Sequence, residues 1–355
     1  MSTTCGHSST YVDCSRAAAN AGFLPEPLVL PGDHLTEQPE EQGQSFKDWF
    51  EMEATQQRNG IISRRNELYV VRPLSMTRPS EEMRDWNKPV LPPDSPPGTE
   101  RWNYMLKMFK QLIVYLRAFY NTMQITQYPK KISFLPIEQR KRVHFVDTPR
   151  TQVIGLKTRD RREPFEIRYR PSPDDVSKIQ LNVSDLRDAL MRSIPPTAHS
   201  FVMVVDHDMY EDGEGAYVTA RAWASDGVAI VSTFRYNPSL DGLAGIDLLH
   251  RWPASHCKAY VDESFKVLSV SGIRQAGEIP PYICPVCYSK LGWELVLLQH
   301  GFEGGIEREK AWLEAQYATL KAFCNKWNKI PLFAAFVAWL EKRLEDRKGD
   351  NDDAA

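Results

Sequence analysis

The run Phe201-Val202-Met203-Val204-Val205 constrains the fold of this chain more than any other segment. It is apolar without interruption and rich in β-branched valine. A strand with one solvated face alternates apolar and polar residues, whereas a strand of a parallel sheet is covered on both faces and is apolar throughout. The run therefore predicts a central strand that other elements bury on both sides.

The segments around this run alternate between helix and strand patterns. Apolar residues three and four apart predict a helix from Met105 to Met123, which ends before Pro129, and a helix over 184–194 capped by Asn182 or Ser184. A short helix at 45–54 and strands at Glu67–Arg72, Ile132–Leu135, Ala216–Trp223 and Val228–Phe234 are also expected. Elements in this order indicate an α/β fold.

The chain divides into four parts by pattern. Residues 1–60 form an N-terminal extension with little periodicity, and residues 61–300 form the α/β domain, interrupted by a proline-rich insertion at 73–99. Residues 301–345 carry two apolar stripes separated by Pro331, which predict C-terminal helices. The charged tail at 346–355 is expected to be disordered.

Charge and hydropathy exclude several classes of protein. The 355 residues include 44 Lys and Arg against 46 Asp and Glu, and this near-neutral balance argues against a nucleic-acid partner. No apolar run is long enough to span a membrane, so no membrane partner is expected. Met1–Cys14 lacks the apolar core of a signal peptide, which favours a cytoplasmic or nuclear location.

The most chemically suggestive pair of residues is Cys284 and Cys287, which stand as Cys-Pro-Val-Cys. Two cysteines at this spacing can bind one zinc ion if a second pair of ligands comes from elsewhere in the chain. The same spacing suits a redox pair or two buried thiols without metal, so three interpretations stay open.

A second candidate, Asp206-His207-Asp208, follows the apolar run directly. Its side chains are of metal-ligand type, and an unusual hydrolase built on them is a further interpretation. Acidic residues after a central strand also serve as caps and turn formers. Both the metal and the structural interpretation remain at this stage.

Several motifs, taken in order, carry a resemblance to a known family. They are Asp206-His207-Asp208-Met209-Tyr210 after a strand, a later strand that ends in Ser232-Thr233-Phe234-Arg235-Tyr236, and Tyr282-Ile283-Cys284-Pro285-Val286-Cys287 followed by Lys290-Leu291. Together with Leu28–Asp33 and Gln44–Trp49, they make residues 5–325 resemble the archaemetzincins, a family of zinc metallopeptidases, in their fungal form.

The resemblance implies a metzincin-like mixed sheet with flanking helices, followed here by a reduced helical C-terminal part. In the family, His-Glu-x-x-His-x-x-Gly-x-x-His-Cys supplies three zinc ligands and a general base. Four cysteines hold a second, structural zinc, and by this resemblance Cys284 and Cys287 are half of that site. The strand ending at Arg235 and Tyr236 resembles the edge strand that pairs with the substrate backbone.

This sequence departs from the family at the chemistry itself, because none of its histidines is followed by Glu. Ile246–Cys257 can be aligned with the motif, which places His250, His256 and Cys257 at ligand positions. Ile246 then replaces the first histidine and Asp247 the general base. In the alternative alignment this stretch lies upstream of a motif that is missing between about Phe265 and Ser271.

Either alignment leaves a catalytic zinc with at most two protein ligands, whereas zinc hydrolases use three. We therefore expect an archaemetzincin-like protein without peptidase activity, whose cofactor is at most a structural zinc on an incomplete cysteine site. Two alternatives remain: a module that binds a peptide or protein along the edge strand at 228–234, and an incomplete sequence of an active metallopeptidase. The family's enzymatic activity thus stays open for this chain.

Overall fold

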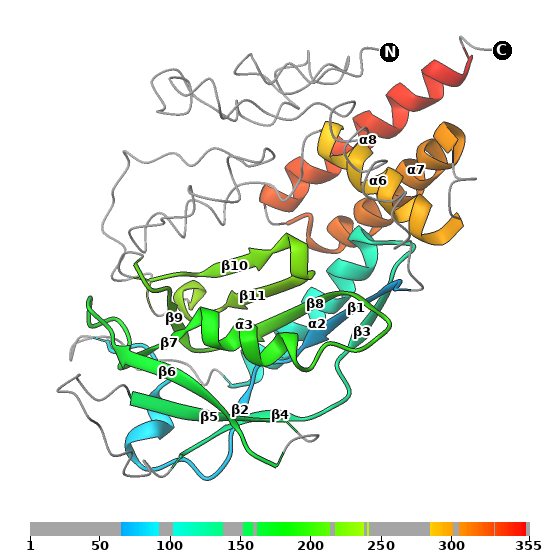
Figure 1. The fold of residues 1–355 in the computed structure, drawn as a ribbon. Helices are drawn as coiled ribbons and strands as arrows, with labels where there is room; N and C mark the ends of the chain where they lie inside the picture. Colours follow the sequence, from blue (N-terminus) through cyan, green and yellow to red (C-terminus); the bar gives the residue numbers. More distant parts are fainter. Residues whose placement is uncertain are drawn as a thin grey trace.

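The protein was analysed as a computed structural model, which describes residues 65–91, 102–137, 152–158, 162–213, 217–237, 240, 285–300, 305–329 and 331–352. It is a mixed α/β fold with two mixed sheets and a C-terminal helical part (Figure 1). The helix expected at 45–54 lies outside the described residues. None of the helices in the described ranges is long and apolar enough to cross a membrane.

The first sheet, sheet A, is built around the apolar run. Its strands, in spatial order, are β10 (Ala220–Trp223), β11 (Val228–Ser232), β8 (Ala198–Val205), β1 (Glu67–Val71) and β3 (Gln124–Gln127). All neighbours pair in parallel except β10, which is antiparallel to β11 at one margin. The run forms most of β8 in the middle of the sheet, so the prediction of a central strand is confirmed.

The second sheet, sheet B, lies beneath sheet A in Figure 1. Its strands, in spatial order, are β2 (Ser75–Met76), β4 (Ile132–Leu135), β5 (Gln152–Thr158), β6 (Phe165–Pro171), β7 (Ile179–Asn182) and β9 (Asp208–Tyr210). Only the two outermost pairs are parallel. The chain passes from β8 of sheet A to β9 of sheet B across Asp206 and His207 alone, so the two sheets meet there.

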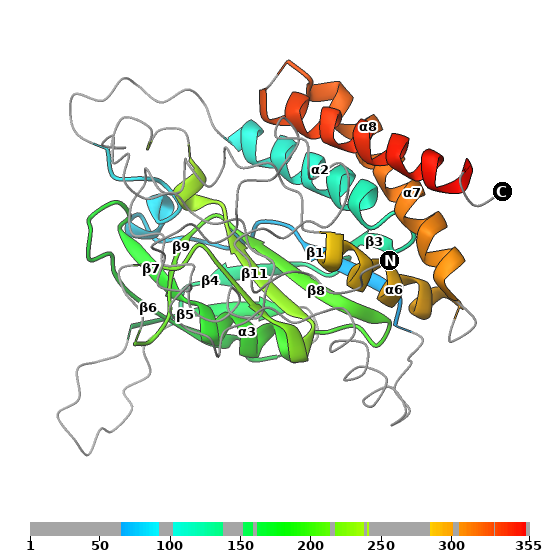
Figure 2. The same ribbon diagram turned by 90° about the horizontal axis from the view of Figure 1, so that it is seen from above.

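Alternating residues of sheet A serve two different cores. Leu68, Val70 and Val204 pack against the helical layer, whereas Phe201 and Met203 pack against sheet B. The helical layer consists of α2 (Trp102–Phe119), α6 (Pro285–His300), α7 (Gly305–Cys324) and α8 (Pro331–Asp352) (Figure 2). A further helix, α3 (Val183–Met191), lies on the sheet B side. Because both faces of β8 are buried, its sequence does not alternate between apolar and polar residues.

Side chains of α7 join it to the end of α2. The last carbonyl groups of a helix have no partner within that helix. Thr319 donates a hydrogen bond to the Ala118 carbonyl at 2.8 Å, and Gln316 donates one to the Phe119 carbonyl at 2.9 Å. The C-terminal helices are therefore fixed to the sheet through α2.

The structure refines several predictions. Asn182 caps α3 by accepting a hydrogen bond from the Asp185 N–H, as expected. The proline-rich segment contains β2, the short helix η3 (Glu82–Asp85) and Trp86, which is buried in the sheet B core. α8 continues to Asp352 and so extends into the segment 346–355 that the sequence predicts to be disordered.

The turn between β10 and β11 depends on Gly227, whose φ of 63° lies in the left-handed region. A Cβ atom at this position would lie 2.6 Å from the His199 carbonyl oxygen. Gly213 also has positive φ, at 80°, but a Cβ atom there would meet nothing within 4 Å. A substitution at Gly213 therefore tests the left-handed backbone strain alone, whereas one at Gly227 tests that strain together with a steric overlap.

We predict that Gly227→Ala lowers the free energy of unfolding by more than Gly213→Ala does. Gly213→Ala introduces only the left-handed strain, about 1–2 kcal/mol. Gly227→Ala adds the overlap with His199, which the backbone must move to relieve. Urea denaturation of both variants measures the difference, and equal losses would contradict the assignment.

Candidate functional site

The candidate site lies where the carboxyl ends of β8 and β11 meet sheet B. In open α/β sheets, ligands bind at the carboxyl ends of the strands. After β8 come Asp206 and His207, and then β9 begins at Asp208. After β11 comes the short helix η5 (Phe234–Tyr236), which contains Arg235.

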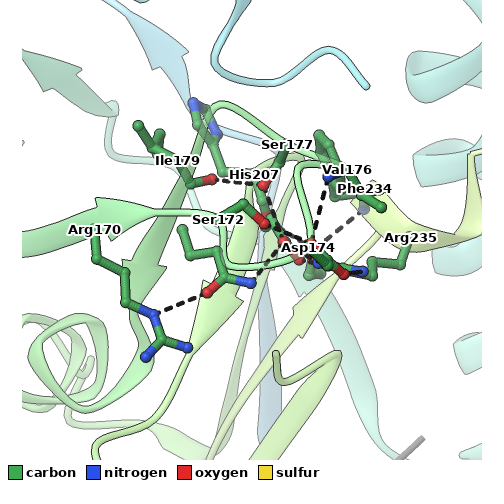
Figure 3. A network of polar contacts seen from close by, with 12 residues as sticks. Arg170, Ser172, Asp174, Val176, Ser177, Ile179, His207, Phe234 and Arg235 are labelled. Atoms are coloured by element: carbon green, nitrogen blue, oxygen red, sulfur yellow. Dashed lines mark hydrogen bonds and ion pairs between the residues drawn. The ribbon is translucent and has the colours of Figure 1, made fainter. Parts of the chain in front are cut away.

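Arg235 is the centre of this region (Figure 3). Its side chain is 1% exposed, and its Nε donates to Asp208 Oδ1 at 2.9 Å. Its Nη1 donates to Asp174 Oδ2 at 2.5 Å, and its Nη2 contacts both carboxylates. The Tyr217 ring stacks on the guanidinium with 3.6 Å between its centroid and Cζ. We call Arg235, Asp174, Asp208 and Tyr217 the Arg235 cluster.

The Arg235 cluster joins the two sheets through side chains. Asp208 in β9 is fully buried and also accepts hydrogen bonds from Ser177 at 3.0 Å and Gln180 at 2.9 Å. Gln180 in β7 accepts in turn from Arg170 in β6 at 3.0 Å. A continuous polar network therefore runs from the end of β11 across three strands of sheet B.

The charged groups of the Arg235 cluster shift the pKa values of their neighbours. Burial lowers the pKa of Arg235, but Asp208 and Asp174 outweigh that effect and raise it. Burial raises the pKa of the Tyr217 hydroxyl, and the two carboxylates add to the rise while Arg235 opposes it. Arg235 and Tyr217 therefore keep their protons throughout the physiological pH range.

The contacts of Arg235 determine how many of its N–H donors remain for a ligand. A guanidinium has five N–H donors, and Arg235 makes four hydrogen bonds to Asp174 and Asp208. Arg235 thus supports the site from inside, whereas its neighbour Tyr236 is half-buried and reaches the surface. A substrate-binding role for these two residues stays a prediction.

The Asp206-His207-Asp208 sequence is divided between two networks. Asp206 contacts His207 Nδ1 at 2.9 Å through Oδ1 and accepts from Asn87 at 2.8 Å through Oδ2. Burial raises the pKa of Asp206, but His207 and Asn87 hold it below its usual value. Asp208 instead belongs to the Arg235 cluster, and the described part of the chain contains no group of three or more His, Cys, Asp or Glu side chains that could hold a metal ion.

The predicted edge strand needs correction. β11, expected to be an edge, pairs with β10 on one side and with β8 on the other, so it lies inside the sheet. The edge is β10, since no other strand in the described ranges pairs with its outer side. The order in which the strands pair decides which of them is the edge, and that order has no local pattern in the sequence.

The pairing register fixes which backbone groups of β10 face outward. The Ser232 N–H donates to the Thr219 carbonyl, and Arg221 stands opposite Ile230. Because antiparallel pairs alternate along the ladder, the backbone groups of Arg221 and Trp223 point to β11. Those of Ala220 and Ala222 point away from the sheet.

Both ends of β10 are held in place. At its start the Val218 N–H donates to the Met209 carbonyl at 2.8 Å, and Arg221 Nε lies 3.2 Å from Glu211. At its end Arg187 of α3 packs over the Trp223 ring at 5.4 Å and pairs with Asp226 in the turn. Contacts at both ends therefore hold β10 in its extended conformation.

The residues proposed for zinc mostly lie beyond the described ranges. Cys257, Cys284, His250 and His256 all fall in the segment 241–284. Cys287 lies in the first turn of α6. The aligned stretch offers at most two histidines, His250 and His256, whereas zinc hydrolases use three protein ligands.

Sequence reasoning missed Asp174, Tyr217 and Gln180. One signal was available: residues 201–220 are acidic and contain no Lys or Arg. Buried carboxylates need cationic partners, so bases from distant segments had to approach them. Arg235 meets this need for Asp208, and Arg221 meets it for Glu211, whose side chain is 15% exposed.

No protein-family model, curated protein or solved structure matches this chain.

Asp174 makes stability depend on pH. Burial raises its pKa, but hydrogen bonds from Arg235 and Ser172 outweigh this and hold the pKa below its usual value. A carboxyl group with a lowered folded pKa stabilises the fold above its unfolded pKa, about 3.9, and that stabilisation disappears as pH falls towards the folded pKa.

We predict that Asp174→Asn loses less unfolding free energy than the wild type between about pH 6 and about pH 3, because the variant has no proton to take up at this position. Urea denaturation at several pH values measures both slopes. Asp188→Asn, at an exposed carboxylate outside the cluster, is the control. Equal slopes for Asp174→Asn and wild type would refute the linkage.

Proposed function

We propose that this chain is an archaemetzincin-like protein that binds an extended peptide along the outer edge of β10 and does not hydrolyse it. The observation that carries the proposal is the outward orientation of the Ala220 and Ala222 backbone groups on a strand fixed at both ends. An extended peptide that adds to a sheet edge gains main-chain hydrogen bonds without needing a deep pocket.

The position of the edge supports the same function. β10 is antiparallel to β11, so its start, Ala220, lies opposite Val231 at the carboxyl end of β11, and the preceding Tyr217 belongs to the Arg235 cluster. The edge therefore adjoins the end of the sheet at which ligands of α/β proteins bind. Tyr236, the predicted substrate-binding residue with access to the surface, lies at this end.

The absence of hydrolysis rests on the sequence. Peptide hydrolysis by a zincin needs two histidines four residues apart and a glutamate beside the first. No such triplet occurs among the 355 residues. The flanking motifs resemble those of archaemetzincins, and this resemblance is the basis for the proposed ancestry of the scaffold. It does not extend to the catalytic residues.

We predict that Ala222→Pro weakens peptide binding at least about tenfold, because proline removes an outward N–H donor and its ring occupies the edge. The ladder to β11 keeps its hydrogen bonds, since the Ala222 N–H does not point there. Affinity for a library of fluorescent heptapeptides, measured by anisotropy, provides the test. Ala222→Val retains the N–H and serves as the matched control.

The proposal also predicts that the wild-type protein leaves the same library intact, as judged by mass spectrometry after prolonged incubation. One tightly bound zinc per chain, together with peptide cleavage that a chelator abolishes, would overturn it. Binding that persists unchanged in Ala222→Pro with a normal melting temperature would place the peptide elsewhere.

A further inference from the structure

We infer that the edge of β10 selects peptides in which an acidic residue stands between two apolar residues. The inference rests on the proposed function and adds to it the chemistry of the partner. It follows from the two faces of β10, which carry different side chains. The strand lies at the margin of sheet A in Figure 1.

Side chains of β10 alternate between the faces of sheet A. Trp223 packs on the core shared with sheet B and under Arg187 of α3. Arg221, two residues earlier, lies on the same face, where it meets Glu211. Ala220 and Ala222 therefore lie on the opposite face, towards the helical layer.

Arg221 is placed to recognise a carboxylate on the bound peptide. Its side chain is 32% exposed, and Glu211 is its sole partner among the described residues, through Nε. The other donors of the guanidinium reach no described residue and can hold a second carboxylate. Because the backbone of Arg221 faces β11, an antiparallel peptide residue opposite it forms a non-hydrogen-bonded pair, in which the side chains approach closely.

The neighbouring peptide residues meet a different surface. Opposite residues of paired strands project to the same face, so the residues opposite Ala220 and Ala222 extend towards the helical side. Next to them on that face are Ala229 and Val231 of β11, both half-buried. Ala222 is exposed and the other three are half-buried, and among the described residues the helical-side core takes side chains from β1, β3 and β8 but none from β10 or β11.

Apolar peptide side chains suit that surface, since they bury it without leaving a polar group unpaired. The two faces together require the order apolar, acidic, apolar in an extended segment. Arg221 is the only basic residue of β10, so the preference for an acidic residue depends on the donors that its contact with Glu211 leaves unused.

The experiment uses the full chain and labelled Ser-Gly-Leu-Glu-Leu-Gly-Ser, with Gln or Lys replacing Glu in two sister peptides and Gly replacing both Leu in a third. We expect the Glu peptide to bind about two- to fivefold more tightly than the Gln peptide, the range of a cross-strand charge pair. The Lys peptide binds less tightly than the Gln peptide, and the Gly-flanked peptide loses most of the affinity. The preference for Glu over Gln decreases as salt is added.

Two variants assign the preference to Arg221. Arg221→Gln should abolish the difference between the Glu and Gln peptides, and Arg221→Lys should retain part of it. Arg192→Gln removes the same charge from an exposed position outside the edge and should change nothing. A Glu preference that survives Arg221→Gln, or equal affinities for the Glu, Gln and Lys peptides, would overturn the inference.

The outcomes separate this inference from the proposed function. If all the peptides bind equally and Ala222→Pro removes the binding, the edge is a docking site without the inferred selectivity. If no peptide binds, or if Ala222→Pro changes nothing, the docking site itself is refuted.

Discussion

The Arg235 cluster is the interaction on which the rest of this structure depends. Asp208 comes from β9 and Asp174 from the loop between β6 and β7, so a single guanidinium joins the end of sheet A to sheet B. Loss of one partner from a buried ion network costs about 3–5 kcal/mol, because the other charges remain without compensation. The arrangement of the two sheets is therefore specified by a few residues where the chain crosses between them.

The same cluster holds the start of the neighbouring edge strand in place. Tyr217, stacked on Arg235, precedes β10 in the chain, and Arg187 and Asp226 hold the other end. A strand already fixed in extended geometry loses little conformational entropy when a peptide pairs with it. The proposed peptide pairing relies on backbone geometry, whereas hydrolysis by a zincin relies on a few side chains.

The sequence predicted the parts of the fold that local chemistry determines. The apolar run identified β8, and the predicted start of α3 was right to within one residue, with Asn182 as one of its two candidate caps. Sheet B was mostly missed, because β6 mixes Arg, Glu and aromatic residues whose partners lie in distant segments. The link between Arg235 and Asp174 spans 61 residues, and the choice of β10 over β11 as the edge is made by pairing order. Neither has a local pattern.

The most direct test of peptide docking without hydrolysis is residue-resolved amide hydrogen exchange of the wild-type protein, with and without a bound peptide, followed by mass analysis of that peptide. The outward N–H groups of Ala220 and Ala222 should exchange more slowly when the peptide is present, the N–H of Arg221 should change little, and the peptide should be recovered whole. Unchanged exchange at Ala220 and Ala222 with a peptide demonstrably bound, or recovery of cleaved peptide, would contradict the account.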